Sequence, residues 1–437
     1  MEAFRAAFEQ VQQESAGNGS VASLRSRAFA RFGEVGLPTT KLESWRFTNV
    51  GPIAERRFGL PRAHEVDASA LSPFVLPGVD GPRAVSVDGR YSPELSGVTG
   101  LPSGVVVGSL AAALAAKEPA AASQLARLAT FDDADRAFTA LNTSLFQDGV
   151  VVIVPDNTVI EAPIHLLFAA TGGDDVMHHP RVLVSVGKNS QVRLIESYAG
   201  LADGAYLTNT VTEVVAGDGA VVDHYKLLRE SVDAYHVASM HLWLGRSSNF
   251  SSHAVTMGGA IARNEVIAEL QGEGAECTLN GLYLVNGTRL VDNRTTIYHA
   301  KPHCNSHELY KGILDDRSRA VFNGKIVVAI DAQKTDAKQT NKALLLSEDA
   351  QINTKPELEI FADDVKCTHG ATIGQLDEDA LFYLRSRGLD SGQARNVLIH
   401  AFATDLLNRI AIGPIRAQLD AVLLQQLPGS GHTPLVV

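Results

Sequence analysis

The chain has 437 residues, of which 45% are hydrophobic and 20% charged, and its formal net charge is −11. This balance is typical of a folded globular protein and excludes disordered and fibrous chains, while the acidic charge argues against binding to a nucleic-acid backbone. The length predicts two or three domains, or one elongated repeat body with flanking parts.

The cysteines and the apolar runs indicate where the protein works. Only Cys277, Cys304 and Cys367 occur, far apart in the sequence, so we expect no disulfide framework and a reducing compartment. The N-terminus, MEAFRAAFEQVQQES, lacks the basic-then-apolar order of a secretory signal. The longest apolar runs fall far short of the roughly 20 residues that span a bilayer. We therefore expect a cytoplasmic protein that is not integral to a membrane.

Residues 1–148 are predicted to form a helical and mixed N-terminal region. After about Gly36, stretches rich in Gly, Pro and Ser follow, and then an Ala-rich segment from Ser109 favours helix. Before Gly36, apolar residues recur at spacings of three or four, which indicates amphipathic helices: Phe4, Phe8, Val11, Leu24, Ala28 and Phe32.

Residues 149–375 are predicted to form an all-β core, because short β-branched runs alternate there with polar turns. A polar turn, a small residue and a strand return at intervals of roughly 27 to 30 residues, in VGKNSQVRLIE, AGDGAVVDHYKL, LGRSSNFSSHAV and QGEGAECTLNGL. Such a period is typical of a solenoid, whose coils bury their inward side chains only against neighbouring coils. The pattern favours a right-handed parallel β-helix, with a β-sandwich as the alternative.

Residues 376–437 are predicted to be helical. Asp377 can cap a helix over LDEDALFYLRSRG, whose acidic residues precede its basic ones. A last helix follows Pro414. Between them a helix begins near Ser391, and its apolar face is predicted to consist of Leu398, Phe402 and Leu406, continued by Ile410.

Several collinear segments carry a family resemblance. The segment DDVKCTHGATIGQLDEDALFYLRSRGL, from Asp363 to Leu389, closely resembles the C-terminal hallmark of the SufB/SufD family. Its Lys-Cys-Thr-His-Gly-Ala-Thr core looks like the SufD branch, because the SufB branch usually has a Glu-His-Glu-Ala-Thr type of sequence there. Further matches are KLESWRFT, FTALNTSLFQDGVVV, ELYKGILDDRSRAVFNGKIVV and KTDAKQTNKALLLSEDAQINTKPELEIFA.

The resemblance implies an N-terminal helical region, a central right-handed β-helix and a C-terminal helical region that docks the ABC-type ATPase SufC. It further implies pairing with a SufB-like subunit through the β-helix, or with a second copy of itself when the chain is isolated. The expected function is a non-catalytic scaffold in SUF iron–sulfur cluster assembly, with no tightly bound cofactor and a transient cluster shared with SufB. No G-x-x-x-x-G-K-[S/T] motif occurs in the sequence, so ATP hydrolysis is assigned to the SufC partner. Neither nucleic acid nor a membrane is an expected partner.

Cys367 and His369 are the candidate cluster ligands. They are two residues apart, so on an extended strand both side chains leave the same face, and thiolate and imidazole both suit iron. The residues alone also allow a buried thiol beside a hydrogen-bonded histidine. The resemblance implies that His369 lies at the SufB interface, where a nascent cluster assembles.

The first C-terminal helix holds the candidate residues for docking SufC, with packing of the helices on the β-helix as the alternative. These candidates are Phe382, Tyr383, Leu384 and Arg385.

His303, Cys304 and His307 form an H-C-x-x-H cluster of the kind seen in metal sites. Structural zinc takes four ligands and no second cluster lies nearby, so we interpret the segment as a turn on the solenoid surface. Cys277 is interpreted as a core thiol, because free cysteines are among the most buried residues.

Two other functions compete with the scaffold. Carboxylate pairs at 315–316 and 363–364 would suit a carbohydrate-active β-helix enzyme, but adjacent residues on a strand point to opposite faces, so we interpret them as solvated turns. A SufB-type subunit would have more cysteines and a glutamate-rich motif in place of Cys-Thr-His. Trp45 and Arg46 in KLESWRFT are predicted to pack the N-terminal region on the β-helix.

Overall fold

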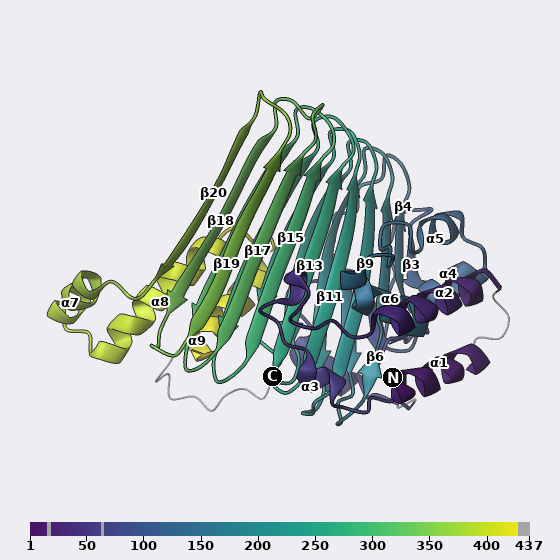
Figure 1. Ribbon diagram of the computed structural model, residues 1–437, viewed down its shortest axis with the longest axis horizontal. Helices are drawn as coiled ribbons and strands as arrows, with labels where there is room; N and C mark the ends of the chain where they lie inside the picture. Colours follow the sequence, from purple (N-terminus) through teal and green to yellow (C-terminus); the bar gives the residue numbers. More distant parts are fainter. Residues whose placement is uncertain (15–18, 63–64, 427–437) are drawn as a thin grey trace.

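The structure, a computed structural model, describes residues 1–14, 19–62 and 65–426. Its body is a parallel β-helix with helices on the outside at both ends of the chain (Figure 1). The strands of successive coils pair in parallel, whereas a β-sandwich is built from antiparallel sheets. The predicted fold class is therefore confirmed and the sandwich alternative is wrong.

Two ten-stranded sheets form the walls of the β-helix within the described ranges. The first sheet contains, in spatial order, β2 (Arg90–Tyr91), β1 (Arg83–Val87), β5 (Ile164–Ala170), β8 (Gln191–Gly200), β10 (Val221–Arg229), β12 (Asn249–Thr256), β14 (Glu276–Val285), β16 (Asn305–Leu314), β18 (Asp336–Leu345) and β20 (Lys366–Gly374). The second sheet contains β19 (Gln351–Ile360), β17 (Arg319–Val328), β15 (Leu290–His299), β13 (Ile261–Leu270), β11 (Tyr235–Leu244), β9 (Leu207–Ala216), β7 (Arg181–Val186), β4 (Gly149–Val154) and β3 (Val106–Ser109), with β6 (Met177–His178) beside β9.

The coils repeat in the predicted register. Equivalent positions in the first sheet lie 27 to 31 residues apart: Gln191, Val221, Asn249, Glu276, Asn305, Asp336 and Lys366. The turns between strands stack as closely as the strands do, and a Cβ on Gly272 would lie 2.0 Å from the Arg246 nitrogen. Position 272 therefore requires glycine, because the neighbouring backbone approaches too closely for a side chain to fit.

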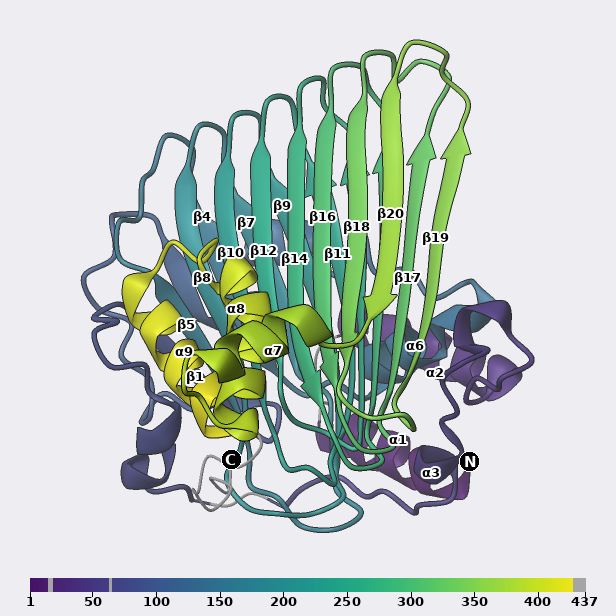
Figure 2. The same cartoon turned by 90° about the vertical axis from the view of Figure 1, so that its left-hand side faces the viewer.

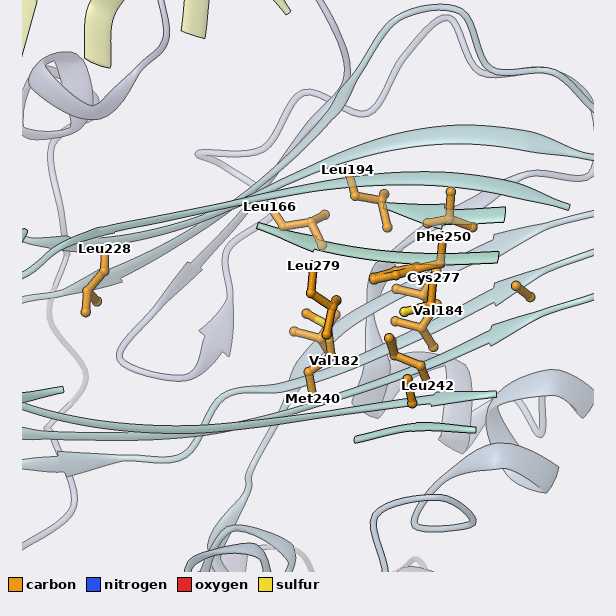
Figure 3. Close-up of a cluster of buried hydrophobic side chains, with 14 of the residues drawn as sticks. Leu166, Val182, Val184, Leu194, Leu228, Met240, Leu242, Phe250, Cys277 and Leu279 are labelled. Carbon is orange, nitrogen blue, oxygen red and sulfur yellow. The ribbon is translucent and has the colours of Figure 1, made fainter. Parts of the chain in front are cut away.

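The core is the row of inward side chains between the two sheets. Figure 3 shows part of it, with residues of the first sheet such as Leu194 and Leu279 facing Val184 and Leu242 of the second. Burial of each such side chain stabilises the fold by about 1.5–3 kcal/mol. Cys277 lies in this core with a buried thiol, as predicted.

Most of the N-terminal region covers the outer face of the second sheet, whereas Leu71 and Phe74 pack on the first sheet. The region includes α1 (Glu2–Glu14), α2 (Gly19–Val35), α3 (Gly51–Ala54), α4 (Leu110–Ala115), α5 (Pro119–Gln124) and α6 (Ala137–Leu145). Trp45 is buried, with its ring 5.4 Å from that of Phe138 and 3.7 Å from the guanidinium carbon of Arg263. The predicted packing role is confirmed for Trp45. It is wrong for Arg46, which is exposed and lies over Phe47, a neighbour along the chain.

The sheets begin within the first 148 residues. Strand β1 pairs in parallel with β5, and β3 pairs antiparallel with β4. The N-terminal region therefore contributes strands to the β-helix as well as helices on its surface.

The C-terminal helices are α7 (Glu378–Ser386), α8 (Ser391–Leu407) and α9 (Gly413–Gln426). Helices α8 and α9 lie on the outer face of the first sheet (Figure 2), and α7 projects from the end of the body (Figure 1). Asp377 caps α7, because its Oδ1 accepts a hydrogen bond from the Ala380 nitrogen at 3.0 Å. No helix among the described residues has the length and apolarity needed to cross a membrane.

The apolar face predicted for α8 is partly wrong. Its buried residues are Ala394, Ile399, Ala403, Leu406 and Leu407. Leu398 and Phe402 are only half-buried, and of these two Phe402 packs against the apolar cluster that α8 shares with the first sheet. Lys311 of β16 fixes this rotation, because its Nζ donates to the Phe402 carbonyl oxygen at 2.9 Å and lies 2.5 Å from Asp405 Oδ2. Ile410 is buried but follows the helix instead of continuing it.

Candidate functional site

The C-terminal end of the β-helix is open. Strands β19 and β20 are the last of their sheets, each pairing with one neighbour, and no strand of the described residues covers their outer edges. Along β20 every residue is exposed except the half-buried Cys367. Unpaired N–H and C=O groups on such an edge can pair with a strand of another chain.

Cys367 and His369 occupy inward positions of this last coil. Their register partners on β18 are Ala337 and Gln339, both buried inside the β-helix. The two side chains therefore share one face, as predicted, and His369 is exposed because no further coil of the described residues lies over it. The pair offers at most two metal ligands, and within the described part of the chain no group of three or more His, Cys, Asp or Glu could hold a metal ion.

The thiol of Cys367 is held in its neutral form. Partial burial raises its pKa, and the neighbouring Asp336 carboxylate adds to the increase. The side chain packs beside Val365, Ala337 and Ala362. Because the thiolate is the form that binds metal, iron would have to displace the thiol proton here.

A column of polar side chains runs inward below His369. Gln339 is the next residue in register, and Glu308 follows on β16. Gln339 Nε2 donates to Glu308 Oε2 at 2.6 Å. Burial raises the pKa of Glu308 to about 7, although the Gln339 hydrogen bond and the neighbouring Thr295 hydroxyl oppose the increase. Glu308 therefore changes charge near neutral pH.

Helix α7 presents its aromatic residues to solvent. Phe382 is 73% exposed and Tyr383 56% exposed, and none of the residues of α7 is buried. Leu384 is half-buried and Arg385 is exposed. Packing of the helices on the β-helix therefore does not account for Phe382 and Tyr383.

The H-C-x-x-H cluster does not converge on a point. His303 lies in the turn between β15 and β16 and is exposed, as is His307 on β16. Cys304 is buried beneath that turn, and its Sγ donates to the Gly272 carbonyl oxygen at 3.2 Å. The segment is a solenoid turn, as predicted.

The carboxylate pairs also lie in turns. Asp316 and Asp364 are exposed; Asp316 accepts a hydrogen bond from the Gly287 nitrogen, and Asp364 pairs with Lys334. These carboxylates order the turns of adjacent coils.

A fully buried ionic cluster inside the β-helix was missed by the sequence reasoning. His236 lies between Lys226 Nζ, 3.1 Å from its Nε2, and Glu230 Oε2, 2.8 Å from its Nδ1. Nearby, His224 Nε2 lies 3.3 Å from Glu196 Oε2. Burial alone would raise the pKa of Glu196, but the hydrogen bond and charge of His224, aided by Lys226, hold it at about 2.

The cluster joins the two sheets. His236 belongs to the second sheet, whereas Glu196, His224 and Lys226 belong to the first, and Glu230 directly follows β10 of the first sheet. The segment VVDHYKLLR contains a signal for buried polar residues, because His224 and Lys226 share one face of the strand with the apolar Val222 and Leu228.

Comparison with known proteins gives a consistent result. The protein-family model described as "SUF system FeS cluster assembly, SufBD core domain" matches residues 168–402, and the family model described as "SufBD protein N-terminal region" matches residues 1–166. An iron-sulfur cluster assembly SufBD family protein of Synechocystis sp. is 35% identical over 420 residues, covering 94% of this chain and 92% of the relative. Escherichia coli SufD is 34% identical over 407 residues, 91% of each chain. Protein ABCI7, chloroplastic, of Arabidopsis thaliana is 31% identical over 389 residues, 87% of this chain and 81% of the relative.

Proposed function

This chain belongs to the SufBD family of iron–sulfur cluster assembly proteins, and on that premise we propose that it is the SufD-like scaffold subunit of a SUF complex. It would pair with a SufB-like subunit, dock a SufC-like ATPase and act in the cytoplasm, without catalysing a reaction itself. The observation that carries the proposal is the open last coil, which presents Cys367 and His369 beside an unpaired sheet edge.

The end of the β-helix suits a second β-helix as partner. The edges of β19 and β20 offer main-chain hydrogen bonds of the kind used when another chain adds a strand. Apolar side chains lie beside them, with Phe361 64% exposed and Ile360 and Ile373 also exposed. A SufB-like subunit would cover these groups, and the same edges would let the isolated chain form a homodimer.

The cluster in this proposal is a transient cargo of the pair of subunits. Cys367 and His369 offer a sulfur and a nitrogen ligand, both of which suit iron. Two ligands leave the remaining iron positions to the SufB-like partner. A shared, incompletely enclosed site is suited to a cluster that must be built and then passed on, and it requires no tightly bound cofactor in this chain.

Helix α7 is the proposed docking site for the ATPase. Exposed aromatic and arginine side chains are enriched among residues that dominate binding energies at interfaces, and Phe382, Tyr383 and Arg385 present such groups. Lys311 joins α8 to β16 through Phe402 and Asp405. When ATP makes two SufC subunits dimerise, a pull on α7 would reach the strands through α8 and open or twist the interface near His369.

The rival functions have less support. A SufB-type subunit is expected to carry a glutamate-rich motif where this chain has Cys-Thr-His. For a carbohydrate-active enzyme, the carboxylates at 315–316 and 363–364 would have to face a substrate together, whereas Asp316 and Asp364 order two separate turns.

Co-expression tests the assembly. The tagged chain is produced with the SufB-like and SufC-like proteins of the same host and purified by affinity and size-exclusion chromatography. We expect all three to elute together. Phe361→Ser with Ile373→Ser should release the SufB-like subunit, whereas Val232→Ser, which removes an apolar side chain that is 53% exposed in a turn outside the last coil, should not. Elution of the unaltered chain without either protein would refute the proposal.

A further inference from the structure

The buried amide beneath His369 is held in one orientation. Gln339 is 1% exposed and lies between Glu308, which accepts a hydrogen bond from its Nε2 at 2.6 Å, and the backbone of Gly324 on the opposite sheet. A Cβ added to Gly324 would lie 2.0 Å from Nε2 and 2.5 Å from Cδ. The absence of a side chain at Gly324 therefore provides the space that the amide fills.

The other end of the same amide has no partner. Gln339 Oε1 is buried and accepts no hydrogen bond from any described residue. Because Nε2 and Oε1 leave the amide carbon in different directions, a contact of Nε2 with Glu308 turns Oε1 away from that carboxyl group. A buried carbonyl oxygen without a donor is destabilising, so an unpaired oxygen at this place calls for an explanation.

His369 is the residue in register with Gln339 on the next coil, at the strand spacing of about 4.8 Å. Its imidazole can donate from one ring nitrogen while the other binds a metal. We propose that Gln339, oriented by Glu308, is a positioning residue that accepts the ring N–H of His369 when His369 binds the nascent cluster. This inference rests on the proposed function and deepens it, because it names the residue that orients the imidazole of His369.

The physical reason lies in how histidine ligands are held. An acceptor for the second ring nitrogen fixes the tautomer and the ring orientation, and loss of such an acceptor lowers metal affinity about 10- to 100-fold. Gln339 can serve only with its oxygen free and its nitrogen engaged, and this is the orientation in which Nε2 donates to Glu308.

The neighbouring buried amide on β18 provides a contrast. Asn341 is as buried as Gln339, but its Nδ2 donates to Thr354 Oγ1 at 3.1 Å and its Oδ1 accepts from the Tyr283 hydroxyl at 3.4 Å. Its register partner on β20 is Ala371, which has no polar group to orient. Asn341 is therefore a matched control for the loss of a buried amide in this strand.

The test uses the complex with the SufB-like and SufC-like subunits, loaded with cluster. Gln339→Met, close in size, removes the acceptor, and Asn341→Leu is the control. Two readouts are the rate of cluster loss to an excess of iron chelator, followed by visible absorbance, and the histidine-nitrogen coupling in pulsed EPR of the reduced cluster. We expect Gln339→Met to accelerate loss about 10- to 100-fold and to change the nitrogen coupling, and Asn341→Leu to do neither.

A second variant guards against misfolding. Gly324→Ala keeps both Gln339 and Glu308 but displaces the amide, so it should also accelerate cluster loss. Equal rates and couplings for the unaltered complex, Gln339→Met and Gly324→Ala would overturn the inference. His369→Ala distinguishes failure of the proposed function from failure of the role of Gln339. If His369→Ala leaves the rate of cluster loss and the nitrogen coupling unchanged, the proposed function fails. If His369→Ala is the one variant that alters them, the role of Gln339 fails.

Discussion

Removal of the Glu213 carboxylate should destabilise the junction between the N-terminal region and the β-helix. Glu213 and Arg181 are both completely buried and form an ion pair at 2.5 Å. Glu213 also accepts hydrogen bonds from the backbone nitrogens of Ala126, Leu128 and Ala129 at 2.8, 2.9 and 3.1 Å. One carboxylate therefore holds a segment of the N-terminal region against the second sheet.

The magnitude follows from what Glu213→Ala leaves behind. An uncompensated buried guanidinium costs about 3–5 kcal/mol, and the buried Ala129 N–H without its acceptor adds about 1–3 kcal/mol. Arg181→Met combined with Glu213→Leu should regain much of the loss, because an apolar pair of similar volume leaves no buried charge. Glu265→Ala is the control. It breaks the partly exposed pair with Arg136, which is worth about 0–1 kcal/mol.

The assay combines urea unfolding, followed by circular dichroism at pH 7, with hydrogen exchange of residues 124–145, because repeat proteins open locally as well as globally. Burial alone would raise the pKa of Glu213, but Arg181 and the backbone N–H groups of Ala129 and Ala126 lower it below the ordinary value of a glutamate. A lowered folded-state pKa gives stability that is present above the unfolded value and is lost as the pH falls. The gap between the unaltered chain and Glu213→Ala should therefore shrink below about pH 4.5. A loss under about 1 kcal/mol at pH 7, or a double variant no more stable than Glu213→Ala, would refute the reasoning.

Three further predictions concern the core and the docking helix. Gly312→Ala should destabilise the chain by about 1–3 kcal/mol in thermal unfolding, because its Cβ would lie 2.2 Å from the Tyr283 ring, whereas Gly370→Ala, with open space around it, should change little. The pKa of Glu308 is raised, so the unfolding free energy of the unaltered chain should fall by up to about 3 kcal/mol as the pH rises from 4.5 to about 7, compared with that of Glu308→Gln. The unfolding free energies of the two chains in urea should therefore depend differently on pH, and parallel profiles would contradict this. Phe382→Ser with Tyr383→Ser should leave the melting temperature unchanged and weaken binding of the SufC-like ATPase at least 30-fold in calorimetry, the effect of about 2 kcal/mol at a hot spot; unchanged affinity would exclude α7 as the docking site.

The period of the coils could be predicted from the sequence because turns in a solenoid must recur in register. That Cys367 and His369 leave the same face of β20 could be predicted for a similar reason, since alternation along a strand depends on local geometry alone. The residue pattern did not show that this face is the inward one, nor that β20 ends the stack and leaves His369 exposed; only the resemblance placed His369 at an interface.

The errors and omissions share a cause. The contact face predicted for α8 was only partly right, because Lys311, distant in sequence, binds the Phe402 carbonyl and Asp405 and fixes the rotation of the helix. The ionic cluster was missed because Lys226 and His236 meet across two sheets, and a sequence shows inward positions but not which side chains face each other. Nothing in the sequence indicated a role for Gln339, since the orientation of its amide depends on Gly324 and Glu308, which lie on other strands.

Iron and sulfide analysis of the co-expressed complex tests the central claim most directly. The complex is purified without oxygen with the unaltered chain, with His369→Ala, and with Thr368→Ala, which removes a neighbouring side chain from the opposite face of β20. The account predicts that all three complexes form, that the unaltered and Thr368→Ala complexes hold equal amounts of iron and sulfide, and that the His369→Ala complex holds little of either. Equal iron and sulfide in all three complexes would contradict it.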